Sequence, residues 1–262
     1  MTLISAGVMR VAHRTSFAVL GLAALLTGCG TKDATDPLIP GPQGRVRFVT
    51  LITDTTKGRV NVLLENVAFG VNLVYGGTTP SSLPSPANAI YSPILTGTRS
   101  LVLKRTADTT AIVATFPLTI ANAADYTVYA TGGAAASAIT SFVTTDTNTA
   151  PALGAVRVRV VHAAPSAGNV DVFVTAVGAD LSLAAPTLAN VAYKGAAYLP
   201  SVAAGTYQVR AVPAGTAAGA RAANVVINLA SVALPANGAR TIIAADNNIG
   251  GAPYRFIVLT DR

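Results

Sequence analysis

Residues 157–162 read RVRVVH, and residues 45–50 read RVRFVT, almost the same string 112 positions earlier. In both strings apolar and polar side chains alternate with a period of two, which is typical of a β-strand with one buried face. The same string at two distant places indicates that one β-rich unit occurs twice in the chain.

Three further pairs of similar strings follow in the same order. RVNVLLENV (59–67) matches NVDVFVTAV (169–177), TGTRSLVLK (96–104) matches AGTYQVRAV (204–212), and DYTVYA (125–130) matches ARTIIA (239–244). The offsets are 110, 108 and 114, the kind of small change that insertions and deletions in loops produce. We therefore expect a first domain at 45–149 and a second at 155–262, with TTDTNTAPALG (144–154) as the linker.

Turn-forming strings separate the predicted strands at short intervals. Examples are AAPSAG (163–168), PAG (213–215) and LPANG (234–238). No segment with helical periodicity longer than about 12 residues follows the N-terminal region. This pattern predicts an all-β chain with two tandem antiparallel β-sandwiches of the immunoglobulin-like kind. An open barrel with Greek-key connections gives the same pattern and is the alternative.

The N-terminal region carries the marks of bacterial export. Arg10 and Arg14 precede an apolar segment at 17–26, which is shorter than the roughly 20 residues that a membrane span needs. The following LTGC (26–29) resembles the lipobox of bacterial lipoproteins, which implies a signal peptide at 1–28 and a lipid on Cys29. The alternative is a plain secretory signal with a stray cysteine. In lipoproteins an Asp after the cysteine favours the inner membrane, so Gly30 indicates the outer membrane, facing the periplasm or the cell surface.

Composition excludes several classes of protein. Loss of residues 1–28 removes two arginines and no acid, which lowers the formal charge from +7 to +5. Only 11% of the residues are charged and no run of like charge occurs, so nucleic acid is not an expected partner. Cys29 is the only cysteine, which rules out an intramolecular disulfide. Residues 29–44 contain Pro37, Pro40 and Pro42 and are predicted to form an extended, lipidated tether.

The string VRVVHAAPSAGNVDVFV (158–174) resembles the bacterial domain of unknown function 4397. Members typically open with a strand ending in Val-His-Ala, continue through a Pro-containing loop to Asp-Val, and later carry Pro-x-x-x-Gly-x-Tyr. Here that later element is PSVAAGTYQVR (200–210), with one extra residue. The resemblance covers nearly all of the second copy and more faintly the first, where ILTGTRSLVLK (94–104) lacks the Tyr. It implies exported or lipid-anchored β-domains and supplies no activity.

His162 and Asp171 are the residues that most resemble an acid–base pair. If the strands around Val160 and Val172 form a hairpin with these two residues opposite each other, His162 faces inward while Asp171 faces outward. We therefore predict that His162 fixes the following loop through its ring nitrogens and that Asp171 lies diagonally beside Arg159. The corresponding residues of the first copy are Thr50 and Asn61, which retain hydrogen-bonding ability without acid–base chemistry.

The remaining inventory predicts no catalytic residue, no metal ligand and no cofactor. After cleavage only one His remains, and Glu65 is the sole Glu of the chain. Candidate calcium-binding loops are TTDTNT (144–149) and ADNNIGG (245–251), although such runs are more typical of turns. The spacing of five tyrosines indicates strand packing and loop anchoring rather than a surface for stacking sugar rings. They are Tyr75, Tyr91, Tyr193, Tyr198 and Tyr207.

The sequence leaves two classes of function. We expect a non-catalytic binding or structural module, attached to the membrane through the lipid on Cys29, with an envelope polysaccharide or protein as its partner. The alternative is a secreted hydrolase or a carbohydrate-binding accessory protein. No catalytic constellation can be assembled from the residues, which favours the first class. The ligand-binding residues are not identified by the sequence.

Overall fold

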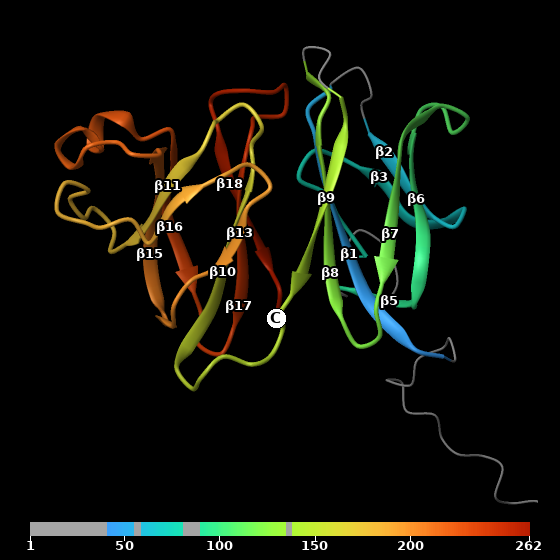
Figure 1. The fold of residues 1–262 in the computed structure, drawn as a ribbon, viewed down its shortest axis with the longest axis horizontal. Coiled ribbons are helices and arrows are strands. Elements are labelled where there is room, and N and C mark those ends of the chain that lie inside the picture. Colours follow the sequence, from blue (N-terminus) through green and yellow to red (C-terminus); the bar gives the residue numbers. More distant parts are fainter. Residues whose placement is uncertain (1–40, 55–58, 81–89, 135–137) are drawn as a thin grey trace, which may run out of the picture. The chain divides into compact units, whose positions relative to one another are not determined.

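The computed structural model describes residues 41–54, 59–80, 90–134 and 138–262. The predicted signal peptide, Cys29 and the tether as far as residue 40 lie outside these ranges. The described part is all-β, with four sheets arranged as two sandwiches, as predicted (Figure 1). It contains two short 3₁₀ turns, η2 (Ala218–Ala220) and η3 (Ala222–Asn224).

The first sandwich consists of an inner sheet of order β4-β1-β8-β9, with β5 also paired to β1, and an outer sheet of order β3-β2-β6-β7. The inner strands are β1 (Gln43–Ile52), β4 (Thr78–Thr79), β5 (Ser92–Leu95), β8 (Asp125–Gly132) and β9 (Thr140–Asp146). The outer strands are β2 (Val60–Leu64), β3 (Val67–Leu73), β6 (Gly97–Arg105) and β7 (Ile112–Ile120).

The second sandwich repeats this topology strand for strand. Its inner sheet has the order β13-β10-β17-β18 with β14 also paired to β10, and its outer sheet has the order β12-β11-β15-β16. The inner strands are β10 (Ala155–Ala163), β13 (Ala196–Tyr198), β14 (Val202–Ala203), β17 (Ala239–Ala245) and β18 (Arg255–Thr260). The outer strands are β11 (Val170–Thr175), β12 (Leu188–Val191), β15 (Gly205–Pro213) and β16 (Ile227–Leu234).

The string pairs found in the sequence occupy equivalent places in this topology. They fall on β1 and β10, β2 and β11, β6 and β15, and β8 and β17. Most strand pairs are antiparallel, but β1 pairs with β8 and β10 with β17 in parallel. Two parallel strands need a long connection, and here that connection carries the whole outer sheet of each sandwich.

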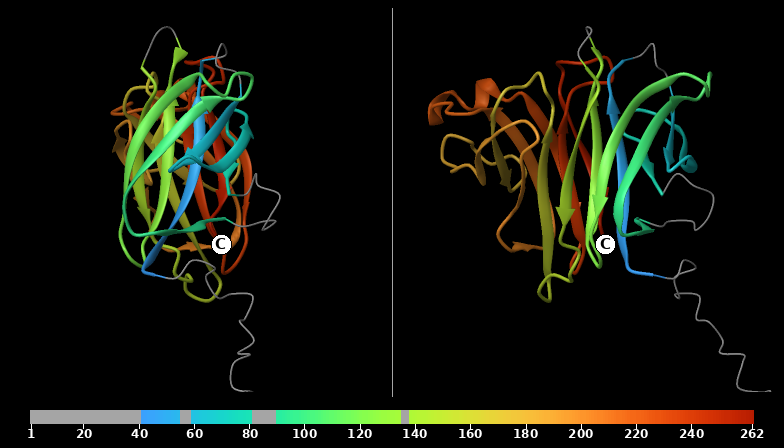
Figure 2. Two further views of the ribbon diagram at one scale, coloured as in Figure 1. Left: turned by 90° about the vertical axis from the view of Figure 1, so that its right-hand side faces the viewer. Right: turned by 45° about the vertical axis from the view of Figure 1, so that its right-hand side comes forward.

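Three apolar clusters lie between the four sheets. One fills the first sandwich around Phe48 and Leu103, and another fills the second around Val160 and Ile242. The third joins the two inner sheets to each other and includes Val49, Leu51, Tyr129, Val161 and Ile243. The two sandwiches therefore belong to one compact unit, and Figure 2 shows their inner sheets adjacent to each other.

This third cluster changes the interpretation of the alternating pattern. On β7 the alternation has the expected meaning, because Phe116 and Leu118 are buried while Thr115 and Pro117 are exposed. On β10 nearly every residue is buried, so the prediction that its polar face meets solvent is wrong. The sequence pattern identifies two faces of a strand but does not show that a second sheet covers the polar one.

Candidate functional site

His162 is the penultimate residue of β10 and is fully buried. Its Nε2 lies 2.6 Å from the carbonyl oxygen of Gly168, and the backbone N–H of Ala164 donates to its Nδ1 at 3.3 Å. Both nitrogens thus bind the loop that follows the strand, which confirms the predicted loop-fixing role. Burial lowers the pKa of His162, so the neutral ring donates through Nε2 and accepts through Nδ1.

Asp171 does not have the surroundings that the sequence predicted. Strands β10 and β11 form no hairpin, because β10 lies in the inner sheet and β11 in the outer sheet. Asp171 is buried rather than outward-facing, and it accepts the backbone N–H groups of Asn190 at 2.7 Å and Gly215 at 3.0 Å. It therefore fixes strand β12 and the turn after β15, and it is not a neighbour of Arg159, whose carboxylate partner is Asp146.

The corresponding residues of the first copy behave in a similar way. Asn61 accepts the backbone N–H of Asn72 at 2.8 Å and the hydroxyl of Thr106 at 3.0 Å. Thr50 exchanges backbone hydrogen bonds with Gly76 and Gly77, as His162 does with the turn at Lys194 and Gly195. The two pairs of positions are therefore structural equivalents, as the sequence predicted.

The most charged buried region lies between the two inner sheets and was not predicted from the sequence. Arg47 on β1 is only 2% exposed and reaches the second sandwich, where its guanidinium lies 2.7 Å from Asp261 and donates to the carbonyl of Thr260 at 3.1 Å. Its Nε also donates to Thr127 in its own sheet at 3.2 Å. Hydrogen bonds on several sides offset the cost of burying this charge.

Arg159 makes the reciprocal contacts from the second sandwich. It is also 2% exposed, pairs with Asp146 of the first sandwich, and donates to Thr144 at 3.1 Å. Its Nε donates to Thr241 at 3.1 Å, as Arg47 does to Thr127. Each sandwich thus contributes one arginine that pairs with a carboxylate of the other sandwich.

Electrostatics stabilise the charged forms of this exchanged pair. Burial alone would raise the pKa of Asp146, but hydrogen bonds from Arg159, Thr127 and Tyr91 and the charge of Arg159 outweigh it and hold the pKa below its usual range. Burial would lower the pKa of Arg159, but Tyr129, Asp146 and Tyr198 outweigh it and raise this pKa. Tyr91 and Tyr198 lie against the two guanidinium groups, at 4.8 Å from Arg47 and 5.6 Å from Arg159.

The five tyrosines act as anchors, as predicted, because each hydroxyl bonds within the protein. Two of them connect the sandwiches: Tyr75 donates to the carbonyl of Asp246 at 2.5 Å, and Tyr193 lies 2.5 Å from the hydroxyl of Thr131. Tyr91 donates to the Asp146 carboxylate, and Tyr198 accepts the backbone N–H of Thr147. Tyr207 donates to the carbonyl of Ala203.

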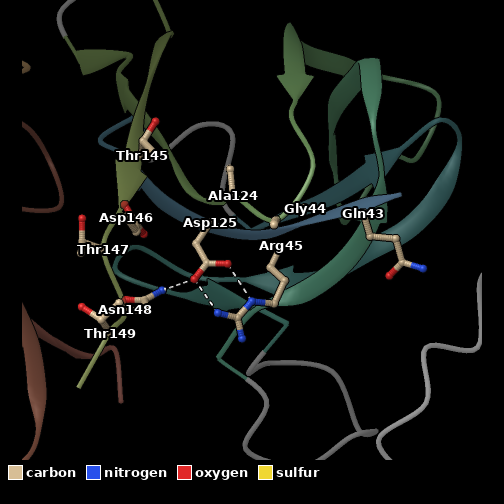
Figure 3. Close-up of a pocket in the computed structure, with 11 residues that line it drawn as sticks. Gln43, Gly44, Arg45, Ala124, Asp125, Thr145, Asp146, Thr147, Asn148 and Thr149 are labelled. Atoms are coloured by element: carbon tan, nitrogen blue, oxygen red, sulfur yellow. Dashed lines mark hydrogen bonds and ion pairs between the residues drawn. The ribbon is translucent and has the colours of Figure 1, made fainter. Parts of the chain in front are cut away.

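A hollow lies at the end of the first sandwich where β1 begins, and Figure 3 shows its lining. It has a volume of about 610 Å³. Arg45 donates two hydrogen bonds to Asp125, at 2.7 and 2.5 Å, and the Asn148 side chain donates to the same carboxylate at 2.7 Å (Figure 3). The Arg45 side chain remains 55% exposed, so it retains open surface toward the hollow.

The lining of this hollow is apolar over most of its area and carries hydrogen-bonding groups among the apolar atoms. These are hydroxyl, amide and backbone groups, with Arg45 and Asp125 as the central pair. The lining residues are Gln43, Gly44, Arg45, Ala123, Ala124, Asp125, Thr145, Asp146, Thr147, Asn148 and Thr149. This set suits a hydroxyl-rich compound such as a sugar, whose groups both donate and accept.

Neither candidate calcium loop gathers its oxygens around one point. In 144–149, Asp146 is occupied by Arg159 and Asn148 donates its amide to Asp125. In 245–251, Asn247 accepts the backbone N–H of Ile249 and donates to the carbonyl of Ala252. Among the described residues, no group of three or more His, Cys, Asp or Glu side chains could hold a metal ion.

Comparison with known proteins adds one finding. Residues 44–173 match the model of a domain of unknown function, DUF4397. The DUF4397 match covers the first sandwich and continues through β10 into β11, so it includes most of the string at 158–174 on which the resemblance was based. The expected extension over the rest of the second copy is not part of the match. No curated protein matches the chain.

Proposed function

We propose that this protein is a lipid-anchored protein of the bacterial cell envelope, held in the outer membrane through Cys29, whose two sandwiches form a non-catalytic binding or structural module. The lipobox-like string at 26–29 and Gly30 support the anchor and its location. In the part of the chain that the structure describes, no helix is long and apolar enough to cross a membrane.

The observation that carries the non-catalytic proposal is the use of the buried ionisable groups. His162 and Asp171 bind backbone groups of neighbouring segments, and the buried arginines and their carboxylate partners hold the two sandwiches together. A catalytic acid or base must reach a substrate, whereas these groups are committed to contacts within the protein. The module therefore offers surfaces and hollows rather than reactive groups.

The second sandwich is, in this proposal, a second copy of the DUF4397 domain. Support comes from its strand order, which repeats that of the first sandwich, and from the string pairs that fall on equivalent strands. The hollow beside Arg45 supports an envelope polysaccharide as a ligand, because its hydroxyl and amide groups match those of a sugar.

The anchor is tested by replacing the thiol that receives the lipid. We expect Cys29→Ser to move the protein from the membrane fraction to the soluble fraction, because multiple acyl chains are what hold such a protein to the bilayer. Detergent partitioning and cell fractionation measure this. Thr27→Ser is the matched control, since it changes the same motif but keeps the thiol. A Cys29→Ser protein that stays in the membrane pellet would contradict the anchor.

The non-catalytic role is tested with panels of glycan and peptide substrates. We expect no turnover by the purified protein. Turnover that disappears in His162→Ala while the variant keeps its thermal transition would show that His162 is catalytic and would contradict the proposal.

A further inference from the structure

A second hollow, of about 450 Å³, lies at the opposite end of β1 from the Arg45 hollow. Both sandwiches contribute to it, through the end of β1, the turn after β3, the loop after β17 and the start of β18. Its lining residues are Ile52, Asp54, Arg59, Val74, Tyr75, Asn248 and Arg255.

The floor of this hollow is held in place from both sides. The Tyr75 hydroxyl donates to the carbonyl of Asp246 at 2.5 Å, which ties the first sandwich to the loop after β17. Gly76 in the same turn donates its N–H to the carbonyl of Thr50 at 2.8 Å. Arg255 lies over the Tyr75 ring, 5.4 Å from its centroid, so the ring positions the guanidinium at the rim.

The two guanidinium groups of the hollow donate no hydrogen bond within the described structure. Arg45, Arg47 and Arg159 each have a carboxylate partner, whereas the side chains of Arg59 and Arg255 make no hydrogen bond or ion pair with any described residue. The hollow also contains Asp54, which is itself engaged in an interaction within the protein. Two arginines and one aspartate therefore give the lining of the hollow a net positive charge.

We infer that this hollow binds the anionic group of an acidic polysaccharide, a carboxylate or a phosphate ester, with Arg59 and Arg255 as its donors. A guanidinium presents several N–H groups in one plane and forms its strongest hydrogen bonds with carboxylate and phosphate oxygens. Asn248 adds an amide at the rim, which can bond to a neighbouring hydroxyl.

The choice of a polysaccharide rests on the proposed anchoring, whereas the anionic chemistry does not. Strand β1 begins at Gln43, next to the tether, and ends at Ile52 in this hollow. The rise per residue of a strand places those two ends roughly 30 Å apart. The chain therefore enters the first sandwich at the end of β1 remote from this hollow, and an envelope polymer is the partner that the proposed anchoring favours.

The test is titration calorimetry with the full chain in detergent. The probes are an oligogalacturonate, which carries carboxylates, a phosphorylated mannose oligomer, and the neutral oligomer maltohexaose. We expect at least one acidic probe to bind more tightly than maltohexaose, which measures any binding of a neutral sugar to the Arg45 hollow. Arg59→Gln and Arg255→Gln should each weaken binding about tenfold, the size of one lost charge-assisted hydrogen bond, and the double variant should lose it.

Arg262→Gln is the matched control because it removes the same charge at a residue outside the hollow. Thermal melting verifies that each variant is folded. The inference is overturned if neither acidic probe binds, if Arg262→Gln weakens binding as much as Arg59→Gln, or if the folded double variant binds like wild type. Membrane fractionation of the same variants is expected to be unchanged, so failure of the anionic site leaves the anchor proposal separately testable.

Discussion

The outer sheets of the two sandwiches have the same strand order, but among the described residues loops cover only the second of them. There, Phe173 on β11 is fully buried in a small cluster with Leu181 and Val212, and Arg221 lies over its ring at 5.2 Å. The equivalent residue of the first sandwich is Leu63, which is only half-buried.

Loop length explains this difference. In the second sandwich the connections at 176–187 and 214–226 are long enough to fold over the sheet. In the first, β2 and β3 are joined by Glu65 and Asn66 alone, both with positive φ as a tight hairpin turn requires. Val67 and Ile112 remain 69% and 63% exposed beside it. One scaffold thus supports a covered or an open outer face, whereas both copies keep the same inner contacts.

The largest expected effect concerns the inner contacts that the two copies share. Asp146→Ala should lower the free energy of unfolding by about 3–5 kcal/mol, because it leaves the buried Arg159 without its carboxylate. Asp261→Ala should cost less, since Asp146 also accepts from Tyr91 and two threonines whereas Asp261 accepts from Thr241. Urea denaturation measures both. A loss below about 1 kcal/mol for Asp146→Ala would mean that the exchanged pairs do not hold the sandwiches together.

The next effect tests the difference between the outer faces directly. Phe173→Ala should cost about 3 kcal/mol, because it opens a cavity beneath the covering loops. Leu63→Ala, at the equivalent position, should cost less than about 1 kcal/mol, because little new cavity forms on a half-exposed surface. Chemical denaturation of both variants decides the matter. Equal losses would show that something also covers the first face in solution.

A smaller effect is expected for the arginine that fastens the covering loops. Arg221 donates to the carbonyls of Ala184 at 2.6 Å, Leu181 at 3.3 Å and Thr216 at 3.3 Å. Arg221→Ala should therefore cost about 1–2 kcal/mol and increase amide exchange at 176–187. Arg240→Ala is the control, with an expected change under about 0.5 kcal/mol. Unchanged exchange in the Arg221 variant would show that the loops stay closed without it.

The smallest effect is a pH dependence confined to the second sandwich. The folded-state pKa of His162 is lowered, mainly by burial, so the unfolded chain binds the proton more readily. The contribution of neutral His162 is present above the unfolded pKa of about 6.5 and is lost as the pH falls below it. Amide protection factors at 163–169, which are corrected for the intrinsic pH dependence of exchange, should fall between pH 7 and 5, and His162→Gln should remove this dependence. Equal dependence in His162→Gln would assign it to another group.

The repeated strings were enough to predict the strand equivalences and the fold class, and the place of His162 near the end of its strand predicted its loop-fixing role. The hairpin between β10 and β11 was wrong because a short loop can either pair two strands or carry the chain to the other sheet. The contacts of Arg47 and Arg159 were missed because their partners lie in the other half of the chain. A signal was present, since an Arg at the same place in both strings coincides with Asp146 and Asp261 at equivalent strand ends.

The predicted second domain at 155–262 implies that these residues fold on their own, and this stays a prediction. The structure adds that such a fragment would expose Val161, Ile243, Arg159 and Asp261 on one face. Because that face carries both an arginine and a carboxylate, the fragment is suited to pairing with a second copy of itself. Its association state therefore needs to be measured together with its thermal transition.

The exchange of arginine and carboxylate partners between the sandwiches also restricts how this protein can be recombined. In a chimera that takes one half from another protein, Arg47 needs an acid at position 261 and Arg159 needs one at position 146. A donor half must bring both an arginine and an acid in register, even when its own core is complete. The outer loops need no matching residue in the other sandwich. Grafting can therefore vary them independently of the other half, while the four charged positions are inherited together.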